Sequence, residues 1–199
     1  MTSPALLARF GLFVQERFLD AELCGSLADE MRSASGHPAT VRVLAEDGVA
    51  YEVDDEHRRT QMAEVSEASV SLIEGRLVEL RPALEQHFSL ALSTIQSPQF
   101  LVYREGDFFR PHVDNATEQV VGDGVSRRRI SVVMFINGRE EYDGGALTFY
   151  GLFDNPTGDT IGIPLEADEG LLITFPSGML HAVAPVTHGE RYTIATWFF

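Results

Sequence analysis

Two segments in the first half of the chain carry apolar residues at helical spacing. Apolar side chains recur every four positions in residues 21–35, which predicts an amphipathic helix that ends at Gly36. Steps of three and four residues continue from 66 to 87 and predict a second, longer helix. Pro82 lies inside this second segment and is expected to kink or break it, because proline lacks a backbone N–H.

Strand-like patterns surround the first of these helices. Apolar and polar residues alternate in part of 10–19, which predicts a short strand before the helix. A second alternation in 41–53 is divided by an acidic, glycine-containing turn at 46–48 and predicts a hairpin. The next residues, 54–59, are polar, so we expect a surface loop in which His57 is a surface histidine.

The second half of the chain is rich in predicted strands. Its apolar runs have strand length, and glycine, proline and asparagine separate them. The main predicted strands are 100–103, 130–136, 146–150, 170–175 and 191–199. This succession predicts an antiparallel jelly roll. The fold class is therefore predicted to be α+β, with the N-terminal helices packed on the outside of the sheet.

The length of 199 residues suits one domain with a sizeable core. We predict a single domain over residues 1–199. In it, residues 1–98 form a helical support region and residues 99–199 form the sheet core that carries the chemistry. The interior of such a double-sheet fold can hold a ligand.

The charge of the chain narrows the choice of partners. Its 15 basic and 30 acidic side chains give a formal net charge of −15, which repels phosphate backbones and anionic membranes. The run at 127–129 is the one basic cluster, and we interpret it as a solvated loop edge or a local steering patch for a small anion. The expected partner is a small molecule or a protein or peptide, with no nucleic acid and no membrane, and the oligomeric state stays open.

A single cysteine and the N-terminal sequence indicate a compartment. Cys24 is the one cysteine, so no intramolecular disulfide can form, and its place in an apolar helical pattern indicates a buried side chain. The N-terminus lacks the basic start and long apolar core of a signal peptide, and no apolar run has the length of a membrane span. We expect a cytoplasmic protein.

Three side chains have the residue types and spacing of a metal site. His112 and Asp114 are separated by one residue, so on an extended segment their side chains share a face. His181 follows several predicted strands later and can complete a set of two imidazoles and one carboxylate. This is the facial triad of non-haem Fe(II) oxygenases, which leaves other coordination positions open.

A fourth residue, Arg191, lies on the last predicted strand among apolar neighbours. A guanidinium in that setting needs an anion, and a carboxylate is its best bidentate partner. Taken singly, each signal has a plainer explanation: a chance His-x-Asp, a core histidine at His181, or a structural ion pair at Arg191. Their combination across the strands of one sheet is far more specific.

These residues belong to longer motifs that resemble a known family, the prolyl 4-hydroxylase-like branch of the 2-oxoglutarate- and Fe(II)-dependent dioxygenases. The resemblance covers residues from about 100 to the C-terminus. It is carried by the motifs Tyr103-x-x-Gly106-x-x-Phe109-x-x-His112-x-Asp114, Asp143-Gly144-Gly145-Ala146-Leu147-Thr148-Phe149, Pro176-Ser177-Gly178-x-x-His181-x-Val183 and Arg191-Tyr192-x-Ile194-x-x-Trp197.

The resemblance implies a fold, a cofactor set and a role for each residue. The fold would be a double-stranded β-helix, the cupin-like jelly roll, in which His112, Asp114 and His181 hold Fe(II). The cosubstrate 2-oxoglutarate would chelate the metal and pair its distal carboxylate with Arg191, and Tyr103 could donate its hydroxyl nearby. The implied reaction uses O₂, with ascorbate as an optional addition, and hydroxylates an aliphatic C–H of a prolyl-type protein residue or a small molecule, with release of succinate and CO₂.

One departure from the family concerns the distal carboxylate. Some relatives place a tyrosine hydroxyl near it from the strand position that is Phe135 here, so Thr148 or Thr193 would have to serve. The side chains expected to shield the site from water are Val102, Val133, Phe135, Leu147 and Trp197. Two polar, glycine-containing segments, 115–129 and 152–164, are candidates for substrate selection or for plain surface connections.

Other functions remain open from the sequence. Oxidative demethylation of nucleic acid is disfavoured by the acidic charge. A catalytically idle jelly roll that binds a carboxylate ligand or a protein partner would have the same fold. A cupin-like isomerase or a cysteine-type dioxygenase is a further alternative, but the triad with a downstream arginine suits an oxo-acid cosubstrate better.

Overall fold

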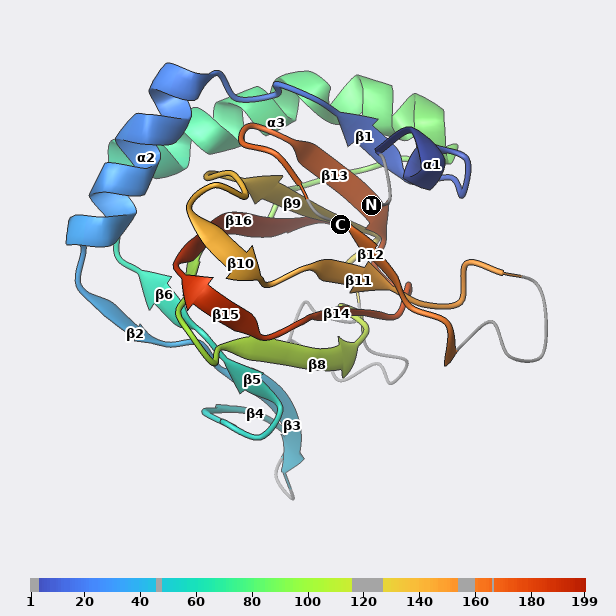
Figure 1. Ribbon diagram of the computed structural model, residues 1–199. Coiled ribbons are helices and arrows are strands. Elements are labelled where there is room, and N and C mark those ends of the chain that lie inside the picture. The colour runs from blue at the N-terminus through green and yellow to red at the C-terminus, as the bar shows by residue number, and fades with distance from the viewer. Residues whose placement is uncertain (1–3, 46–47, 116–126, 154–159, 166) are drawn as a thin grey trace.

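The computed structural model describes residues 4–45, 48–115, 127–153, 160–165 and 167–199. Two antiparallel sheets face each other, and helices cover the outer side of the larger one (Figure 1). The larger sheet has the strand order β1-β13-β9-β16-β7-β6-β2. Its strands are β1 (Phe13–Gln15), β2 (Gly36–Pro38), β6 (Gln61–Ala63), β7 (Gln99–Tyr103), β9 (Ile130–Phe135), β13 (Leu172–Pro176) and β16 (Arg191–Phe198).

The smaller sheet has the order β12-β11-β14-β8-β5. Its strands are β5 (Arg58–Arg59), β8 (Phe108–His112), β11 (Leu147–Phe149), β12 (Ile163–Leu165) and β14 (His181–Val183). Two further antiparallel pairs join β3 (Val41–Ala45) to β4 (Gly48–Glu52), and β10 (Tyr142–Gly144) to β15 (Val186–Gly189). The β3–β4 hairpin projects from the end of the molecule opposite the helices (Figure 1).

Three helices complete the described structure: α1 (Pro4–Ala8), α2 (Ala21–Ser33) and α3 (Glu67–Phe88). The Asp20 side chain accepts a hydrogen bond from the Leu23 N–H at 2.9 Å and caps α2. α2 ends earlier than predicted, with Ala34 as its C-cap, because Gly36 already pairs with Ala63 in β2. The predicted helices are otherwise confirmed.

The helix α3 does not break at Pro82, so that part of the prediction is wrong. A proline inside a helix removes one backbone hydrogen bond, here to the carbonyl of Val78. Val78 is 48 % exposed, and Pro82 is exposed as well, so water can hydrate that carbonyl in place of the lost N–H.

Two apolar clusters lie on opposite sides of the larger sheet. The first joins α2 and α3 to the sheet and includes Tyr192, Ile194 and Phe198 of β16. The second lies between the two sheets and includes Tyr103 and Phe149. Because side chains alternate along a strand, every second residue of β16 faces away from the helices, toward the smaller sheet.

The strand predicted over 10–19 is wrong in extent. Backbone hydrogen bonds continue the turn after α1 as far as Gly11, whose φ of 82° ends it, and β1 covers Phe13–Gln15 alone. Phe18 and Leu19 pack against the helices. The apolar residues of 10–19 therefore contribute to two hydrophobic clusters and do not form one face of a single strand. None of the described helices is both long and apolar enough to cross a membrane.

Residues before position 99 do more than support the sheet core from outside. They contribute β1, β2 and β6 to the larger sheet and β5 to the smaller one. The β5 strand lies within the segment predicted as a polar loop, so that prediction is wrong for its two residues, Arg58 and Arg59, which pair with Phe109 and Phe108 of β8. This pairing brings the N-terminal half against the strand that carries His112.

Candidate active site

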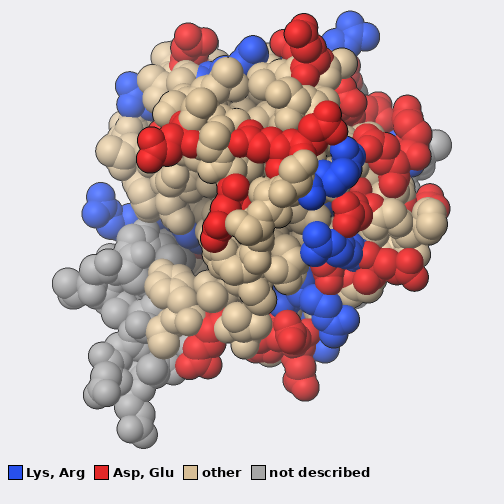
Figure 2. All heavy atoms as spheres, turned by 90° about the vertical axis from the view of Figure 1, so that its left-hand side faces the viewer, with Lys and Arg blue, Asp and Glu red and all other residues tan. Residues whose placement is uncertain are grey.

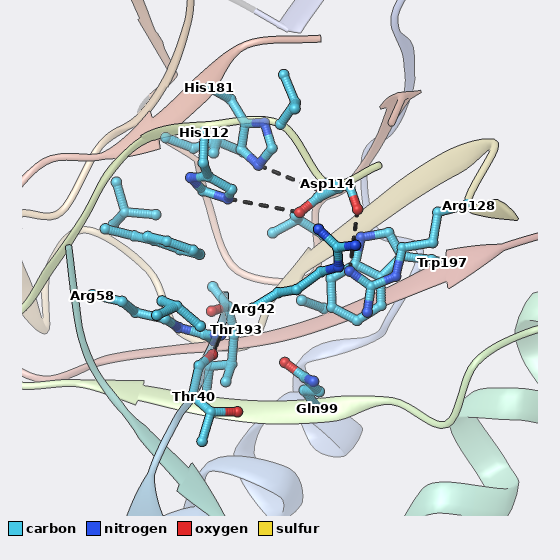
Figure 3. Close-up of a pocket in the computed structure, with 18 of the residues that line it drawn as sticks. Thr40, Arg42, Arg58, Gln99, His112, Asp114, Arg128, His181, Thr193 and Trp197 are labelled. Atoms are coloured by element: carbon cyan, nitrogen blue, oxygen red, sulfur yellow. Dashed lines mark hydrogen bonds and ion pairs between the residues drawn. The ribbon is translucent and has the colours of Figure 1, made fainter. Parts of the chain in front are cut away.

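A cavity of about 720 Å³ opens between the two sheets. The larger sheet lines it with alternate residues of β7 and β16, and the smaller sheet lines it from β5, β8 and β14. Figure 3 shows His112, His181 and Asp114 pointing toward one another at one wall of this cavity. The three residues that the sequence spacing selects are therefore brought together.

The two histidines come from paired strands. His112 ends β8, His181 begins β14, and the two residues are partners in the antiparallel register. Each Nδ1 lies within hydrogen-bond distance of a backbone carbonyl two residues earlier, that of Arg110 at 2.8 Å and that of Met179 at 2.9 Å. Because a carbonyl only accepts, Nδ1 of each ring carries a hydrogen, which leaves Nε2 as the nitrogen that can bind a metal in the neutral tautomer.

Asp114 completes the group from the segment that follows β8. Its Oδ1 lies 3.6 Å from Nε2 of His112, and its Oδ2 lies 3.5 Å from Nε2 of His181. These distances exceed a hydrogen bond, so the atoms face a shared space. The Ser131 hydroxyl donates to Oδ2 at 2.7 Å and fixes the carboxylate. All three potential ligand atoms lie within 4.8 Å of one another.

Aromatic rings hold the imidazoles in place. The Phe109 ring stacks on His112 with centroids 3.5 Å apart and an angle of 17°. Phe175 meets His181 edge-on at 4.8 Å between centroids. Burial, followed by the electrostatic effect of His181, lowers the pKa of His112 to about 3. His112 is therefore neutral near pH 7, as metal coordination requires.

The carboxylate of Asp114 is also in its ligating form. Burial alone would raise its pKa, but attraction from His181 and His112 and the Ser131 hydrogen bond outweigh burial and lower it. Two imidazole nitrogens and one carboxylate oxygen, facing a cavity, are the donor set of the facial triad. The residues present thus fit an Fe(II) ion with open coordination positions.

Arg191 lies in the same cavity and is 1 % exposed. Its guanidinium carbon lies 5.0 Å from the Tyr103 ring centroid and 5.1 Å from that of Phe135, while one amino group donates to Thr193 Oγ1 at 3.4 Å. No carboxylate among the described residues pairs with Arg191, and its Nε has no hydrogen-bond partner there. A buried guanidinium in this state favours an anionic ligand.

The other residues singled out for the cosubstrate differ in position. Tyr103 and Thr193 line the cavity, and Tyr103 is the register partner of Arg191. Thr148 does not line the cavity, and its hydroxyl is directed at the Ala146 carbonyl. Thr193 is therefore the better placed of the two threonines to replace the absent tyrosine hydroxyl.

The predicted apolar wall needs two corrections, at Val102 and at Phe135. Val133, Leu147 and Trp197 line the cavity, whereas Val102 packs toward the helices. The alternation along β7 gives the reason, since Tyr103 faces the cavity and its direct neighbour must face the other way. Leu101 takes the place assigned to Val102. Phe135 lies beside Arg191 within the second cluster and is not among the lining residues.

Several polar residues that line the cavity were not anticipated, among them Arg58 on β5, Gln99 on β7 and Arg42 on β3 (Figure 3). Arg128, which belongs to the basic run at 127–129, also lines the cavity. His57 is exposed, as predicted, but it lies at the cavity with its Nδ1 2.7 Å from Asp54. No hydrophobic pattern marks Arg58, because it lies in a run of polar residues.

The two segments predicted to select the substrate lie largely outside the described residues. Of 115–129, residues 116–126 are not described, but the flanking Asn115 and Arg128 line the cavity. Of 152–164, residues 154–159 are not described. Their role stays a prediction.

Comparison with known families identifies the family to which the fold belongs. Residues 98–199 match the model of the 2OG-Fe(II) oxygenase superfamily. The chain belongs to this superfamily. The matched region contains His112, Asp114, His181 and Arg191, whereas Arg42 and Arg58 lie before it.

Individual relatives of this 2OG-Fe(II) oxygenase indicate its branch. It is 34 % identical over 134 residues to a PKHD-type hydroxylase of Cupriavidus metallidurans, covering 66 % of this chain and 56 % of that protein. It is 37 % identical over 116 residues to a PKHD-type hydroxylase of Klebsiella pneumoniae, covering 56 % of this chain and 47 % of that protein. The chain thus spans about half the length of these relatives.

Solved structures confirm the predicted double-stranded β-helix. A prolyl-4-hydroxylase of Pseudomonas putida has a TM-score of 0.72 and 25 % identity, over 96 % of this chain and 94 % of that one. A prolyl hydroxylase of Trichoplax adhaerens, solved with a hypoxia inducible factor peptide fragment, has a TM-score of 0.66 at 17 % identity, over 98 % and 86 %. Together with the PKHD-type relatives, the first confirms the resemblance to the prolyl 4-hydroxylase-like branch.

Proposed function

We propose that this protein is a 2-oxoglutarate- and Fe(II)-dependent dioxygenase that hydroxylates an aliphatic C–H of a prolyl-type residue or a small molecule. In the balanced reaction, one O₂ and one 2-oxoglutarate are consumed for each hydroxyl group formed, and succinate and CO₂ are released. The observation that carries the proposal is that one cavity holds both a His-Asp-His ligand group and a buried arginine without an acidic partner among the described residues.

Each residue has a distinct task in this proposal. His112, Asp114 and His181 would hold Fe(II) through Nε2, one carboxylate oxygen and Nε2 respectively. The metal, bound with 2-oxoglutarate and O₂, supplies the oxidising chemistry. Arg191 would bind and orient the distal carboxylate of 2-oxoglutarate, with Thr193 accepting from the same guanidinium.

The remaining walls control access to the site. Leu101, Val133 and Leu147 line the cavity with apolar surface and would exclude water from the oxidant. The Tyr103 ring lies 5.0 Å from the Arg191 guanidinium, so its hydroxyl could donate near the same carboxylate.

Anaerobic addition of Fe(II) and 2-oxoglutarate tests the proposal. A weak visible charge-transfer band of the chelate should appear in the wild type and be lost in Asp114→Ala. Arg191→Gln should need at least a tenfold higher 2-oxoglutarate concentration for the same band, whereas Arg104→Gln, a change at a surface arginine paired with Glu190, should behave like wild type.

A folded wild type that forms no band would contradict the proposal. The alternative of an idle jelly roll that binds a carboxylate ligand or a protein partner would then be favoured. A band that forms normally in Arg191→Gln would place the cosubstrate anchor elsewhere. Succinate formation under O₂, followed with ascorbate present and absent, would separate turnover from binding.

A further inference from the structure

A second buried arginine, Arg58, lines the same cavity as Arg191. It is 8 % exposed, and its guanidinium carbon lies 4.8 Å from the centroid of the Phe109 ring. One amino group donates to the Thr40 carbonyl at 3.1 Å, and the buried Nε has no partner among the described residues. No described carboxylate forms an ion pair with Arg58, although Asp114 acts on its charge from beyond ion-pair distance.

The cavity is basic although the chain is acidic. Its described lining includes four of the fifteen Lys and Arg side chains but only two acidic side chains, those of Asp54 and Asp114. The arginines are Arg42, Arg58, Arg128 and Arg191. On the outer face in Figure 2, acidic side chains are spread widely among smaller basic groups. The basic side chains in the cavity therefore form a local site that can bind an anion.

The proposed cofactors would not occupy Arg58. The two charges of Fe(II) would offset those of 2-oxoglutarate, and Arg191 would pair with the distal carboxylate of that cosubstrate. Arg58 would keep a buried Nε that has no hydrogen-bond partner among the described residues. Asp54 already lies 2.7 Å from His57, at the exposed side of the cavity. A further anion would fit the fully loaded site.

The surroundings of Arg58 suit a carboxylate. A planar guanidinium fork matches two oxygens of one carboxylate, and a buried site strengthens that pairing. Arg58, Thr40 and Gln99 also line a small adjoining cavity of about 50 Å³. Gln99 Oε1 is buried there without a partner among the described residues, so an N–H or O–H group can bind beside the carboxylate.

The position of Arg58 places such an anion close to the metal ligands. The Phe109 ring contacts the guanidinium of Arg58 and stacks on His112. One aromatic side chain therefore connects the anion site to the triad. A carboxylate held by Arg58 and a C–H directed at the metal can belong to one small molecule or one amino-acid residue.

We propose that the primary substrate carries a carboxylate and that Arg58 binds it. This inference rests on the proposed function, because it assigns Arg58 to the substrate while Arg191 holds the cosubstrate. Burial lowers the pKa of Arg58, and Tyr103 and Asp114 offset only part of that change, so an anion beside the guanidinium would stabilise its charged form. Arg58 is then a specificity-determining residue.

Trp197 provides a direct readout. It is the one tryptophan of the chain, it lines the cavity, and the Arg128 guanidinium lies 3.6 Å from its ring centroid. The protein is loaded with Mn(II) and saturating 2-oxoglutarate, which prevents turnover, and titrated with propionate or with its neutral isostere propionamide. Propionate should change the Trp197 fluorescence with an affinity at least tenfold above that of propionamide.

Variants assign the binding to Arg58. Arg58→Gln should weaken propionate binding at least tenfold, and Arg58→Lys should retain part of it because the charge remains. The matched control is Arg59→Gln, since Arg59 lies next in β5, is exposed and stacks on Phe108 outside the cavity. Circular dichroism checks folding, and the comparison of acid with amide in the wild type does not depend on any variant.

Three results would overturn the inference. The first is equal affinity of the wild type for propionate and propionamide, and the second is unchanged propionate affinity in folded Arg58→Gln. The third is a propionate affinity that falls as the 2-oxoglutarate concentration is raised, because that competition would place the anion at Arg191. If Mn(II) and 2-oxoglutarate themselves do not bind, the proposed function fails instead, so the two failures are distinguishable.

The source of the carboxylate is tested by turnover with Fe(II) and O₂. The paired probes are L-proline with L-prolinamide, and glycyl-L-proline with glycyl-L-prolinamide. Stimulation of succinate formation by the free acid alone would indicate a small-molecule substrate, and stimulation by the dipeptide acid would indicate a peptide carboxyl group. Stimulation by both amides as strongly as by the acids would contradict the inference.

Discussion

At the scale of single residues, the hydroxyl of Ser131 connects the metal site to the larger sheet. It donates to Oδ2 of Asp114 at 2.7 Å and lies 3.0 Å from the Ser177 hydroxyl. Outer hydrogen bonds of this kind orient a ligand, and their loss costs about 10- to 100-fold in metal affinity. We therefore expect Ser131→Ala to weaken Mn(II) binding by about that factor, as measured by calorimetric titration.

A second buried hydroxyl provides the control. Thr174 lies on the neighbouring strand, in register with Val132, and its hydroxyl has no partner in the described structure. Thr174→Val removes a hydroxyl from the same sheet without touching Asp114, so metal affinity should not change. Equal loss in both variants would mean that general loosening of the sheet, and not the Asp114 hydrogen bond, is responsible.

His112 makes the stability of the metal-free protein depend on pH. Its pKa is about 3 in the folded protein against 6.5 ordinarily, so below about pH 6.5 the unfolded chain binds a proton that the folded chain does not. The free energy of unfolding should therefore fall as the pH is lowered from about 6.5 toward 3. The lowered pKa of Asp114 adds a further loss below about 3.8, where the unfolded carboxyl takes up its proton first.

Urea denaturation of the chelator-treated protein between pH 7.5 and pH 4.5 measures this dependence. His112→Asn should show a flatter dependence, because the group that titrates differently is gone. His37→Asn, a change at a partly exposed histidine outside the metal site, should keep the wild-type dependence. Parallel curves for wild type and His112→Asn would contradict the assignment of the effect to His112.

The residues of the triad could be selected from the sequence, and Arg58 could not. His112 and Asp114 share a face through local geometry alone, since alternate residues of an extended segment point the same way. The burial of Arg58 depends on pairing with Phe109, some fifty residues away, inside a polar run that carries no local sign of burial. The burial of Arg58 could therefore not be predicted, because hydrophobic patterns do not reveal which distant strand a polar segment pairs with.

At the scale of elements, the turn between β10 and β11 supports the arginine of β16. Gly145 has a φ of 62°, and a Cβ built there would lie 2.9 Å from Cδ of Arg191 and 3.0 Å from Cγ2 of Val186. A side chain at this position must therefore displace the guanidinium stem. This close approach is a physical reason for a glycine in the Asp143-Gly144-Gly145 motif.

We expect Gly145→Ala to lower the free energy of unfolding by about 1–2 kcal/mol, because a non-glycine residue is strained at positive φ. It should also raise the 2-oxoglutarate concentration for half-saturation by about tenfold or more, because Arg191 is displaced. Thermal unfolding and the anaerobic chelate band measure the two effects.

The matched change is Gly75→Ala in α3, where no heavy atom lies within 4 Å of the new Cβ. It should stabilise the fold by about 0.5–1 kcal/mol, since glycine is unfavourable inside a helix. The 2-oxoglutarate requirement should stay the same. An unaltered requirement in Gly145→Ala would show that Arg191 tolerates the displacement.

Elements with strong periodicity were predicted well. α2, α3 and the last strand have long apolar patterns, and their type and approximate extent are confirmed. The prediction of one strand over 10–19 was wrong because the apolar residues of this segment are divided between two hydrophobic clusters. A single alternating pattern assumes that they all face one core. The error at Val102 was avoidable, because placing Tyr103 in the cavity already decides the direction of its neighbours along β7.

At the scale of the whole molecule, charge sets what can approach. A net charge of −15, with arginines gathered in one cavity, repels polyanions but leaves a local site for a small anion. We expect no binding of labelled single-stranded DNA at 50 mM salt, as measured by fluorescence anisotropy. Salt-sensitive binding at micromolar protein would contradict this expectation and revive the demethylase alternative.

The compartment also stays a prediction at this scale. Cys24 is fully buried, and burial raises its thiol pKa to about 12, so the thiol is not reactive near neutral pH. This agrees with the sequence-based interpretation of a small buried hydrophobe and with the expectation of a reducing cytoplasm, which fractionation of cells would test.

The position of β5, outside the region matched to the family, affects how the substrate specificity of such an enzyme can evolve. The family match begins at residue 98, so the residues that would handle iron and 2-oxoglutarate lie within it, while Thr40, Arg42 and Arg58 lie before it. Descendants of one gene could therefore diverge in the segment 36–63 and acquire new substrates while inheriting the oxidative half intact. The same boundary is the natural place to join the halves of two relatives when a new hydroxylase is built.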